Sequence, residues 1–163
     1  MALLEGLSVD KLDRTDRELK ITDGAEKLIS NLRLLGYKTA ILSGGFEFFA
    51  TRLARRLGID YVHANQLDVA DGKLTGNICG EIVDDQRKAE LLRSIAESEG
   101  IQVQQVIVVG DAANDITMLS SAGLGIAFHS KPEVCDEGGD SLGTVGRDGI
   151  LYLIGMRDNE IRD

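Results

Sequence analysis

The stretch "VIVVGDAANDITML", Val106 to Leu119, decides the predicted fold. A short apolar run that ends at a glycine is typical of a buried strand. Three polar side chains follow it at short spacing, namely Asp111, Asn114 and Asp115. In a parallel α/β sheet, ligands bind beyond the carboxyl ends of the strands. We therefore expect these three side chains at the edge of a sheet where a ligand can bind.

The rest of the chain repeats this unit of strand and helix. Apolar residues recur at helical spacing over 25–35, 46–57 and 86–99, and each of these segments leads through a glycine into an extended run. The alternation predicts an α/β fold, a Rossmann-like three-layer α/β/α parallel sheet. Further predicted elements are strands at 104–110 and 124–128, a helix from about Ala113, a short helix at 131–138, and a terminal helix or strand at 148–155.

The segment between Asn65 and Asp84 has a different pattern. Short alternating runs surround "ADGK", in which Asp71-Gly72 is a turn signal. Asp-Gly between two alternating runs favours a tight two-residue turn. We therefore expect a small β-hairpin insert at about 65–84.

Composition limits the classes of function. The chain has 163 residues, a length that can bury one core. Its formal net charge is -9, so its surface would repel nucleic-acid backbones and anionic lipids. Cys79 and Cys135 have no spacing typical of a disulfide framework or a zinc cluster. No apolar run approaches the ~20 residues of a membrane span, and the first residues lack a basic segment of the signal-peptide kind. We expect a cytoplasmic protein without a nucleic-acid or membrane partner.

"SGG", Ser43 to Gly45, stands between a predicted strand and a predicted helix. Backbone N–H groups at such a place favour an anion, and the Ser43 hydroxyl adds a donor, so Ser43 and Gly44 could hold a phosphoryl oxygen. The competing interpretation is a tight turn in which Ser43 caps the helix. The motif by itself does not decide between them.

Oxygen ligands clustered as in Asp111, Asn114 and Asp115 suit a hard cation such as Mg²⁺. The alternative is that Asp111 or Asn114 caps the helix that follows, which is the commoner role of an isolated acid. Lys88, near the start of the helix after the hairpin, could neutralise a phosphoryl group or a carboxylate at the same edge. Most lysines at such positions are solvated.

Taken together, "ILSGGF", "DDQRKAE" and "VVGDAANDITML" resemble three of the four motifs of the haloacid dehalogenase superfamily of phosphatases, in the same order and spacing. The connecting segments "ALLEGL", "ANQLDVADGKLTG" and "AGLGIAFHSKP" look like those of its phosphoserine phosphatase family. The resemblance covers nearly the whole chain. Its one local departure is Ala112, where the family has glycine after the motif aspartate.

The resemblance implies Mg²⁺-dependent hydrolysis of O-phospho-L-serine to L-serine and phosphate through a covalent aspartyl phosphate. It assigns Asp111 and Asp115 to the metal, and it assigns Ser43, Gly44, Lys88 and Asn114 to the phosphate. Lys88 would also stabilise charge on the nucleophile, as the one catalytic residue of the family that this sequence matches. The resemblance also places residues 1–20 as a remnant of a helical cap and 21–163 as the core.

The family's first motif, Asp-x-Asp-x-Thr, supplies the nucleophile and the general acid and base, and it does not occur in these 163 residues. We therefore expect negligible turnover by this chain alone. Two classes of function stay open: a phosphoserine phosphatase known through an incomplete reading frame, or a non-catalytic relative that binds Mg²⁺, phosphate or a protein. A phosphatase for another small phosphomonoester is a variant of the first class. A homodimer that fills the place of the first strand is a further prediction.

Overall fold

The computed structural model describes residues 4–110, 115–128, 140–142, 150–153, 156–157 and 160–162. The chain divides into two compact units. Unit 1 comprises Met1–Thr22 and Ile29–Val83, and unit 2 comprises Asp23–Leu28 and Asp84–Asp163. In the part of the chain that is described, no helix is both long and apolar enough to cross a membrane.

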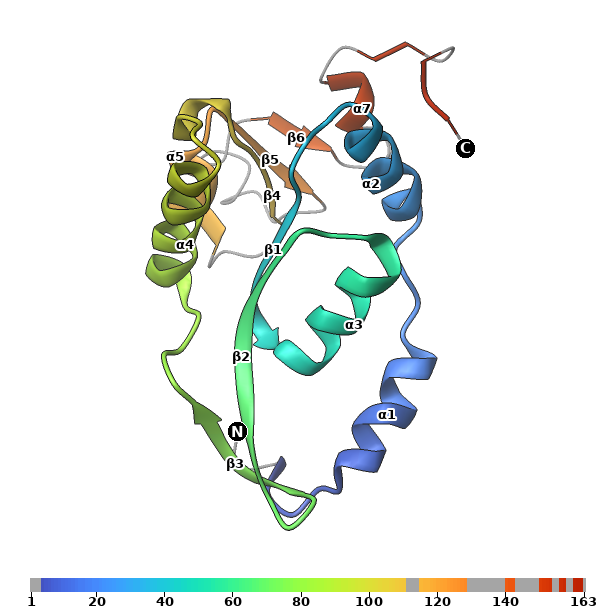
Figure 1. Cartoon of the computed structure of the whole chain (residues 1–163), viewed down its shortest axis with the longest axis vertical. Helices are drawn as coiled ribbons and strands as arrows, with labels where there is room; N and C mark the ends of the chain where they lie inside the picture. Colours follow the sequence, from blue (N-terminus) through green and yellow to red (C-terminus); the bar gives the residue numbers. More distant parts are fainter. Residues whose placement is uncertain are drawn as a thin grey trace. The chain divides into compact units, whose positions relative to one another are not determined.

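Unit 1 contains a three-stranded mixed sheet in the order β1-β2-β3 (Figure 1). Its strands are β1 (Ala40–Phe46), β2 (Tyr61–Ala70) and β3 (Lys73–Cys79). β1 and β2 are parallel, whereas β2 and β3 are antiparallel and form the predicted hairpin. Asp71 and Gly72 at the hairpin turn have positive φ angles of 50° and 73°, as a two-residue turn of the primed type requires.

Two helices of unit 1 follow from their apolar spacing. α3 (Glu47–Leu57) packs on β1 and β2 through a face that includes the buried Ala50 and Ala54, and it ends at Gly58, whose φ of 73° lies in the left-handed region that favours glycine. α1 (Val9–Glu18) begins at Ser8, whose hydroxyl accepts a hydrogen bond from the backbone N–H of Asp10. A third helix, α2 (Ala25–Leu34), contains the boundary between the units.

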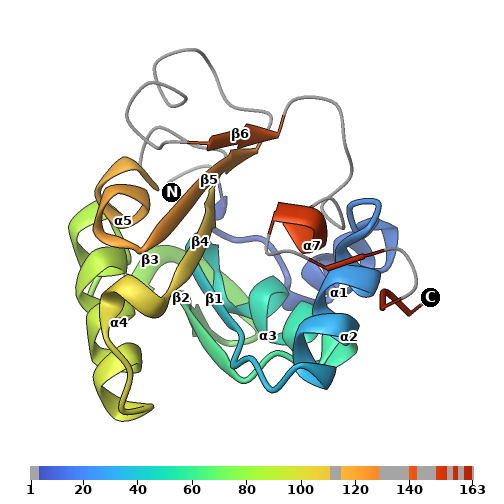
Figure 2. The same cartoon turned by 90° about the horizontal axis from the view of Figure 1, so that it is seen from above.

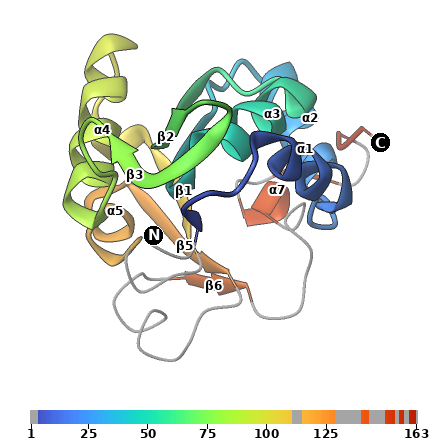
Figure 3. The same cartoon turned by 90° about the horizontal axis from the view of Figure 1, so that it is seen from below.

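The segment that leads into α1 runs beside β3, as Figure 3 shows. The backbone N–H of Gly6 donates to the carbonyl oxygen of Leu74 at 2.8 Å, and the N–H of Leu74 donates to the carbonyl oxygen of Leu7 at 2.8 Å. Leu74 itself is 2% exposed. These bonds pair one side of the hairpin with the start of the chain.

Unit 2 contains a parallel sheet in the order β4-β5-β6 (Figure 2). Ile126 and Ala127 on the middle strand are fully buried, and α5 packs on β4 and β5 while also contacting α4. The elements of unit 2 are α4 (Asp85–Ser98), the 3-10 helix η2 (Val103–Gln105), β4 (Ile107–Gly110), α5 (Ile116–Ser121), β5 (Leu124–Phe128), β6 (Asp140–Leu142) and α7 (Ile150–Leu153).

The predicted α/β class with parallel strands is confirmed, and so are the hairpin insert and the three long helices. The described strands form two sheets of three strands, with β1 and β4 each at the edge of its own sheet. The strand expected at 104–110 begins only at Ile107, because Val103–Gln105 form a 3-10 helix. The side chain of Gln105 accepts a hydrogen bond from the backbone N–H of Gln102, which precedes this helix. The terminal segment is helical at Ile150–Leu153.

Two further predictions are not tested by the described residues. The short helix expected at 131–138 falls outside the described residues. The division into a cap remnant at 1–20 and a core at 21–163 stays a prediction, since the compact units reflect contacts between residues and not the limits of a cap.

Candidate functional site

Ser43, Gly44 and Gly45 lie within unit 1, at the end of β1. The strand continues through them to Phe46, and its register with β2 shifts between Ser43 and Phe46. This corrects two expectations. "SGG" is an irregular stretch of the strand and not a separate loop, and Ser43 does not cap the helix, because the N-cap of α3 is Phe46, which offers no side-chain hydrogen bond.

The Ser43 hydroxyl has a local role instead. Its Oγ accepts a hydrogen bond from the backbone N–H of Gly45 at 3.0 Å. A hydroxyl that accepts one bond can still donate its own hydrogen, and the described residues give that hydrogen no acceptor. Gly44 and Gly45 are exposed. The strand end therefore offers a hydroxyl donor and bare backbone directly before the uncapped N-terminus of α3, an arrangement that suits an anion.

A side chain that the sequence analysis did not single out, Asn65 on β2, holds this strand end. It is 3% exposed. Its Nδ2 donates to the carbonyl oxygen of Gly44 at 2.7 Å, and its Oδ1 accepts from the backbone N–H of Val83 at 2.8 Å. The sequence could have indicated this residue, because Asn65 is a polar residue at the start of the predicted hairpin insert.

Lys88 and Asp115 lie within unit 2 and form a buried ion pair. The Nζ of Lys88 donates to Oδ1 of Asp115 at 2.7 Å, and the two side chains are 4% and 11% exposed. Lys88 is therefore not one of the solvated lysines that the alternative interpretation assumed. Asp115 stands at the N-cap of α5 but makes no capping hydrogen bond, so its carboxylate serves the lysine and not the helix.

Gly110 makes this position of Asp115 sterically accessible. A Cβ atom at Gly110 would lie 2.8 Å from Cβ of Asp115 and 2.9 Å from its Oδ2, closer than real Cβ atoms approach other atoms. The glycine at the end of β4 thus lets the carboxylate come against the strand. The sequence pointed to Gly110 through the Gly110-Asp111 pair that ends the apolar run. The aspartate that lies against Gly110, however, is Asp115.

A second contact joins α4 and α5 near their starts. Thr117 Oγ1 donates to Oδ2 of Asp85, while Oδ1 of Asp85 is buried and has no hydrogen-bond partner among the described residues. Asp84 caps α4 by accepting from the N–H of Arg87 at 2.8 Å. The Thr117–Asp85 bond links α5 to the first turn of α4, which carries Lys88, and the Asp84 cap closes that turn.

Asp111 and Asn114 lie outside the described residues. Among the residues that are described, no group of three His, Cys, Asp or Glu side chains could hold a metal ion. Ser43 and Gly44 belong to unit 1. Lys88 and Asp115 belong to unit 2, where they are in direct contact.

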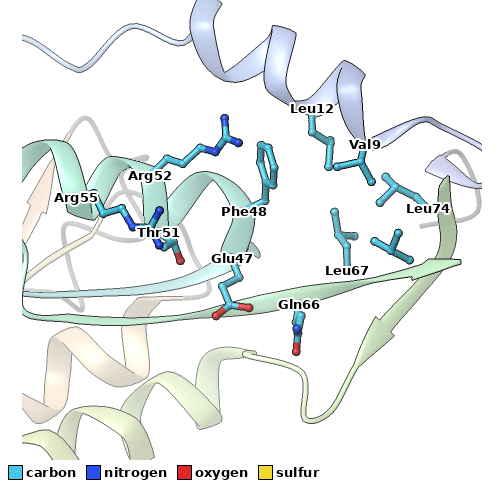
Figure 4. A pocket seen from close by; sticks show the side chains of 11 residues that line it. Val9, Leu12, Glu47, Phe48, Thr51, Arg52, Arg55, Gln66, Leu67 and Leu74 are labelled. Carbon is cyan, nitrogen blue, oxygen red and sulfur yellow. The ribbon is translucent and has the colours of Figure 1, made fainter. Parts of the chain in front are cut away.

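Unit 1 also has a pocket of about 330 Å³ between α1, α3 and the hairpin strands (Figure 4). Its wall is mostly apolar, with Leu12, Phe48 and Leu67 among the lining residues. Arg52 at its rim lies over the Phe48 ring and forms ion pairs with Asp13 and Asp16 on α1. None of the site residues predicted from the sequence lines this pocket.

Comparison with known proteins gives consistent results. A family model described as haloacid dehalogenase-like hydrolase matches residues 1–120. A phosphoserine phosphatase of Streptomyces coelicolor is 42% identical over 99% of the chain, and one of Archaeoglobus fulgidus is 44% identical over 93%. The chain spans only 39% and 43% of the length of these two relatives.

Solved structures agree with the sequence relatives. A structure described as a phospho-aspartyl intermediate analogue of phosphoserine phosphatase superposes with a TM-score of 0.88 at 39% identity. That match covers 93% of this chain and 72% of the other. The resemblance inferred from the motifs is therefore confirmed over nearly the whole chain.

Proposed function

This chain belongs to the haloacid dehalogenase-like hydrolase family, and from that premise we propose that it supplies the phosphate-binding and metal-binding part of a Mg²⁺-dependent phosphoserine phosphatase. The observation that carries the proposal is the buried ion pair of Lys88 and Asp115. Removing two charges from water is costly, so a buried ion pair is weak evidence for a role in stability alone. The pair joins two of the three matched motifs through a direct contact.

The roles of the residues follow from their chemistry. Lys88 is a buried cation that would neutralise charge on a phosphoryl oxygen, where low dielectric strengthens the attraction. The Ser43 hydroxyl and the backbone of Gly44 would bind further phosphoryl oxygens. Asn114 would add an amide donor. The substrate assigned to this set is O-phospho-L-serine, as in the named relatives.

The donor chemistry fits Mg²⁺. Asp115 uses one carboxylate oxygen for Lys88, and its Oδ2 lies beside the end of β4, next to Gly110. Asp111 follows Gly110 directly in the chain and would add a second carboxylate. Oxygen ligands of this kind are those that Mg²⁺ prefers. When bound, the ion would neutralise charge on the transferring phosphoryl group.

The covalent step needs a group that these residues do not supply. An aspartate carboxylate would form a bond to phosphorus while the serine oxygen leaves with a proton, and water would then hydrolyse the acyl phosphate. The Asp-x-Asp-x-Thr motif that provides this nucleophile in the family is absent from the 163 residues. We therefore predict that the chain alone binds phosphate and Mg²⁺ but does not turn over phospho-L-serine.

Calorimetric titration of the purified chain tests the binding half of this proposal. Phosphate and Mg²⁺ should bind to the wild-type chain. Asp115→Asn should weaken Mg²⁺ binding, because it removes a charged ligand while leaving an oxygen for Lys88, and Asp111→Asn should do the same. Lys88→Gln should weaken phosphate binding about tenfold or more, since hydrogen bonds to charged groups contribute about 1.5–3 kcal/mol.

The matched control for Lys88→Gln is Lys73→Gln, which removes an exposed lysine of β3 and should change neither affinity. Circular dichroism would verify that each variant is folded. Failure of the wild-type chain to bind phosphate would contradict the proposal. Steady release of phosphate from phospho-L-serine by the pure chain with Mg²⁺ would contradict the predicted lack of turnover.

The missing nucleophile motif also supports a second candidate, a non-catalytic protein that binds Mg²⁺ and phosphate. To distinguish the two candidate functions, a peptide that ends in Asp-x-Asp-x-Thr would be added to the chain. Turnover of phospho-L-serine in the mixture supports the phosphatase, whereas unchanged phosphate binding without turnover supports the binding protein. The same assay with other small phosphomonoesters tests substrate choice. The predicted homodimer stays a prediction, which sedimentation would test.

A further inference from the structure

Asn65 uses both ends of its buried amide on backbone groups far away in the sequence. Its Nδ2 donates to the carbonyl oxygen of Gly44, 21 residues earlier, and its Oδ1 accepts from the N–H of Val83, 18 residues later. At 3% exposure, water cannot replace either bond. A buried polar group that loses its partner is destabilised by about 1–3 kcal/mol. The amide is therefore a specific link and not an incidental contact.

The strand register explains why Gly44 needs such a link. β1 pairs with β2 at Ser43 and again at Phe46, and the register shifts between them. Gly44 and Gly45 thus lie where the ladder does not fix them, and two consecutive glycines have wide conformational freedom. Something other than strand pairing must set the direction of their shared peptide group.

Two hydrogen bonds hold that peptide group from its opposite sides. The carbonyl oxygen of Gly44 and the N–H of Gly45 belong to the same planar unit and point in opposite directions. Asn65 holds the carbonyl at 2.7 Å, and Ser43 Oγ holds the N–H at 3.0 Å. A flip of the peptide would break both bonds at once. Because Ser43 Oγ accepts from Gly45, this geometry also leaves the Ser43 hydroxyl hydrogen to donate elsewhere.

We propose that Asn65 is a positioning residue that fixes the Gly44–Gly45 peptide group and thereby orients the Ser43 hydroxyl toward a phosphoryl oxygen. This role rests on the proposed phosphate binding at Ser43 and Gly44. Asn65 acts through the backbone and does not itself touch the phosphate. Its second bond, to Val83, closes the base of the hairpin insert and holds the side chain in place.

If Asn65 had a purely structural role, only its bond to Val83 at the base of the hairpin would matter. The variants must therefore distinguish that bond from the bond to the Gly44 carbonyl. Asn65→Asp keeps an acceptor for the Val83 N–H but places a carboxylate oxygen against the Gly44 carbonyl. Asn65→Leu removes both bonds and adds no charge, which controls for repulsion between phosphate and the new carboxylate. Asn77→Asp, on the exposed part of β3, is the matched control for the same chemical change.

The experiment measures phosphate affinity, Mg²⁺ affinity and amide hydrogen exchange at Gly45 on the folded chains. In both Asn65 variants we expect phosphate affinity to fall about tenfold, which corresponds to about 1.4 kcal/mol. Exchange at Gly45 should become faster, while Mg²⁺ affinity stays unchanged. Asn77→Asp should alter none of the three. If the leucine variant does not fold, Gly45 exchange in the aspartate variant, measured without phosphate and therefore free of charge repulsion, decides the question: unchanged exchange would overturn the positioning role.

The outcomes separate this role from the proposed function. If the wild-type chain binds phosphate and both Asn65 variants bind it equally well with unchanged Gly45 exchange, the positioning role is wrong while the function stands. An equal loss of phosphate and Mg²⁺ affinity in the Asn65 variants would indicate general destabilisation and would also overturn the positioning role. If the wild-type chain does not bind phosphate, the proposed function fails and the positioning role fails with it.

Discussion

In unit 1 the strand end at Ser43 is held by neutral hydrogen bonds, whereas in unit 2 Lys88 and Asp115 hold each other by opposite charge. The bonds at Ser43 and Asn65 involve a hydroxyl, an amide and backbone groups. The pair in unit 2 is almost fully removed from water, with side chains 4% and 11% exposed. The predicted phosphate-binding residues are thus positioned by two different physical means.

The difference decides what a substitution would do in each region. Removing a neutral hydrogen bond changes stability by about 0.5–1.5 kcal/mol, so a variant can lose function while it stays folded. Removing one member of a buried ion pair leaves an uncompensated charge, which is destabilising by about 3–5 kcal/mol. Unit 1 is therefore the region where function can be separated from folding, and unit 2 is the region where the two are coupled.

Lys88→Met should give the largest effect. The substitution keeps the apolar stem but leaves the Asp115 carboxylate buried without its partner, so the free energy of unfolding should fall by about 3–5 kcal/mol. Urea denaturation followed by circular dichroism measures it. The control is Lys38→Met, because the Nζ of Lys38 lies 3.9 Å from Oδ1 of Asp60 with 55% of its side chain exposed, and such a pair contributes at most about 1 kcal/mol.

The double variant Lys88→Met with Asp115→Leu sharpens this test. It removes both charges together, and replacing a buried pair by apolar residues is often neutral. Stability should return to within about 1 kcal/mol of the wild type, while Mg²⁺ and phosphate binding should be weaker than in the wild type. If the double variant is as unstable as Lys88→Met, the loss comes from packing and not from an uncompensated charge.

Gly110→Ala should give an intermediate effect. The new Cβ would meet Asp115 at 2.8 Å, and the buried carboxylate has little room to move, so overpacking should lower stability by about 1–3 kcal/mol. Gly45→Ala in unit 1 is the matched comparison, because its Cβ would meet only the Ser43 hydroxyl, at 3.1 Å. That side chain can rotate away, and we expect a loss below about 1 kcal/mol. Equal losses in urea denaturation would contradict the contrast between the regions.

Elements that depend on local pattern were predictable from the sequence. The helical spacing of residues such as Leu28 and Leu92, together with the stop at Gly58, gave three helices close to their observed limits. Asp71-Gly72 gave the hairpin because the turn needs positive φ at both positions. In each case the signal and the structure lie within one short segment.

Features that depend on distant partners were not predictable in this way. The pattern of Ser43 to Gly45 fitted both a phosphate-binding strand end and a turn with a capping serine. The structure places these residues within β1, where the register with β2 shifts and Asn65 holds the Gly44 carbonyl. Lys88 and Asp115 were both selected as site residues, yet nothing in their local sequence shows that they pair across 27 positions. Gly110 was recognised as the end of a strand, while its contact with Asp115 required the fold.

The smallest effect should come from Asp60, a charged anchor at the opposite end of the β1–β2 pair from Asn65. Its Oδ2 accepts from the backbone N–H of Thr39 at 2.8 Å and from the Thr39 hydroxyl at 3.0 Å. The Thr39 backbone bond is the main cause that lowers the pKa of the Asp60 carboxyl below its ordinary value of 3.8, and the hydroxyl and Lys38 act in the same direction. The stabilisation is thus complete above pH 3.8 and is lost as the pH falls through the folded-state pKa.

Asp60→Asn should therefore lower the free energy of unfolding by about 1 kcal/mol at neutral pH, and the difference from the wild type should shrink in acid. Urea denaturation at about pH 7 and about pH 2.5, on either side of the ordinary carboxyl pKa, measures this. Thr39→Val removes the hydroxyl, which donates to Asp60 Oδ2 and accepts from the Asp60 N–H at 3.4 Å. It keeps the Thr39 backbone N–H, the main cause of the lowered pKa of Asp60, so its effect at neutral pH should be smaller. A difference that is the same at both pH values would show that Asp60 acts through packing. The charged anchor would then add no pH dependence to a region otherwise held by neutral bonds.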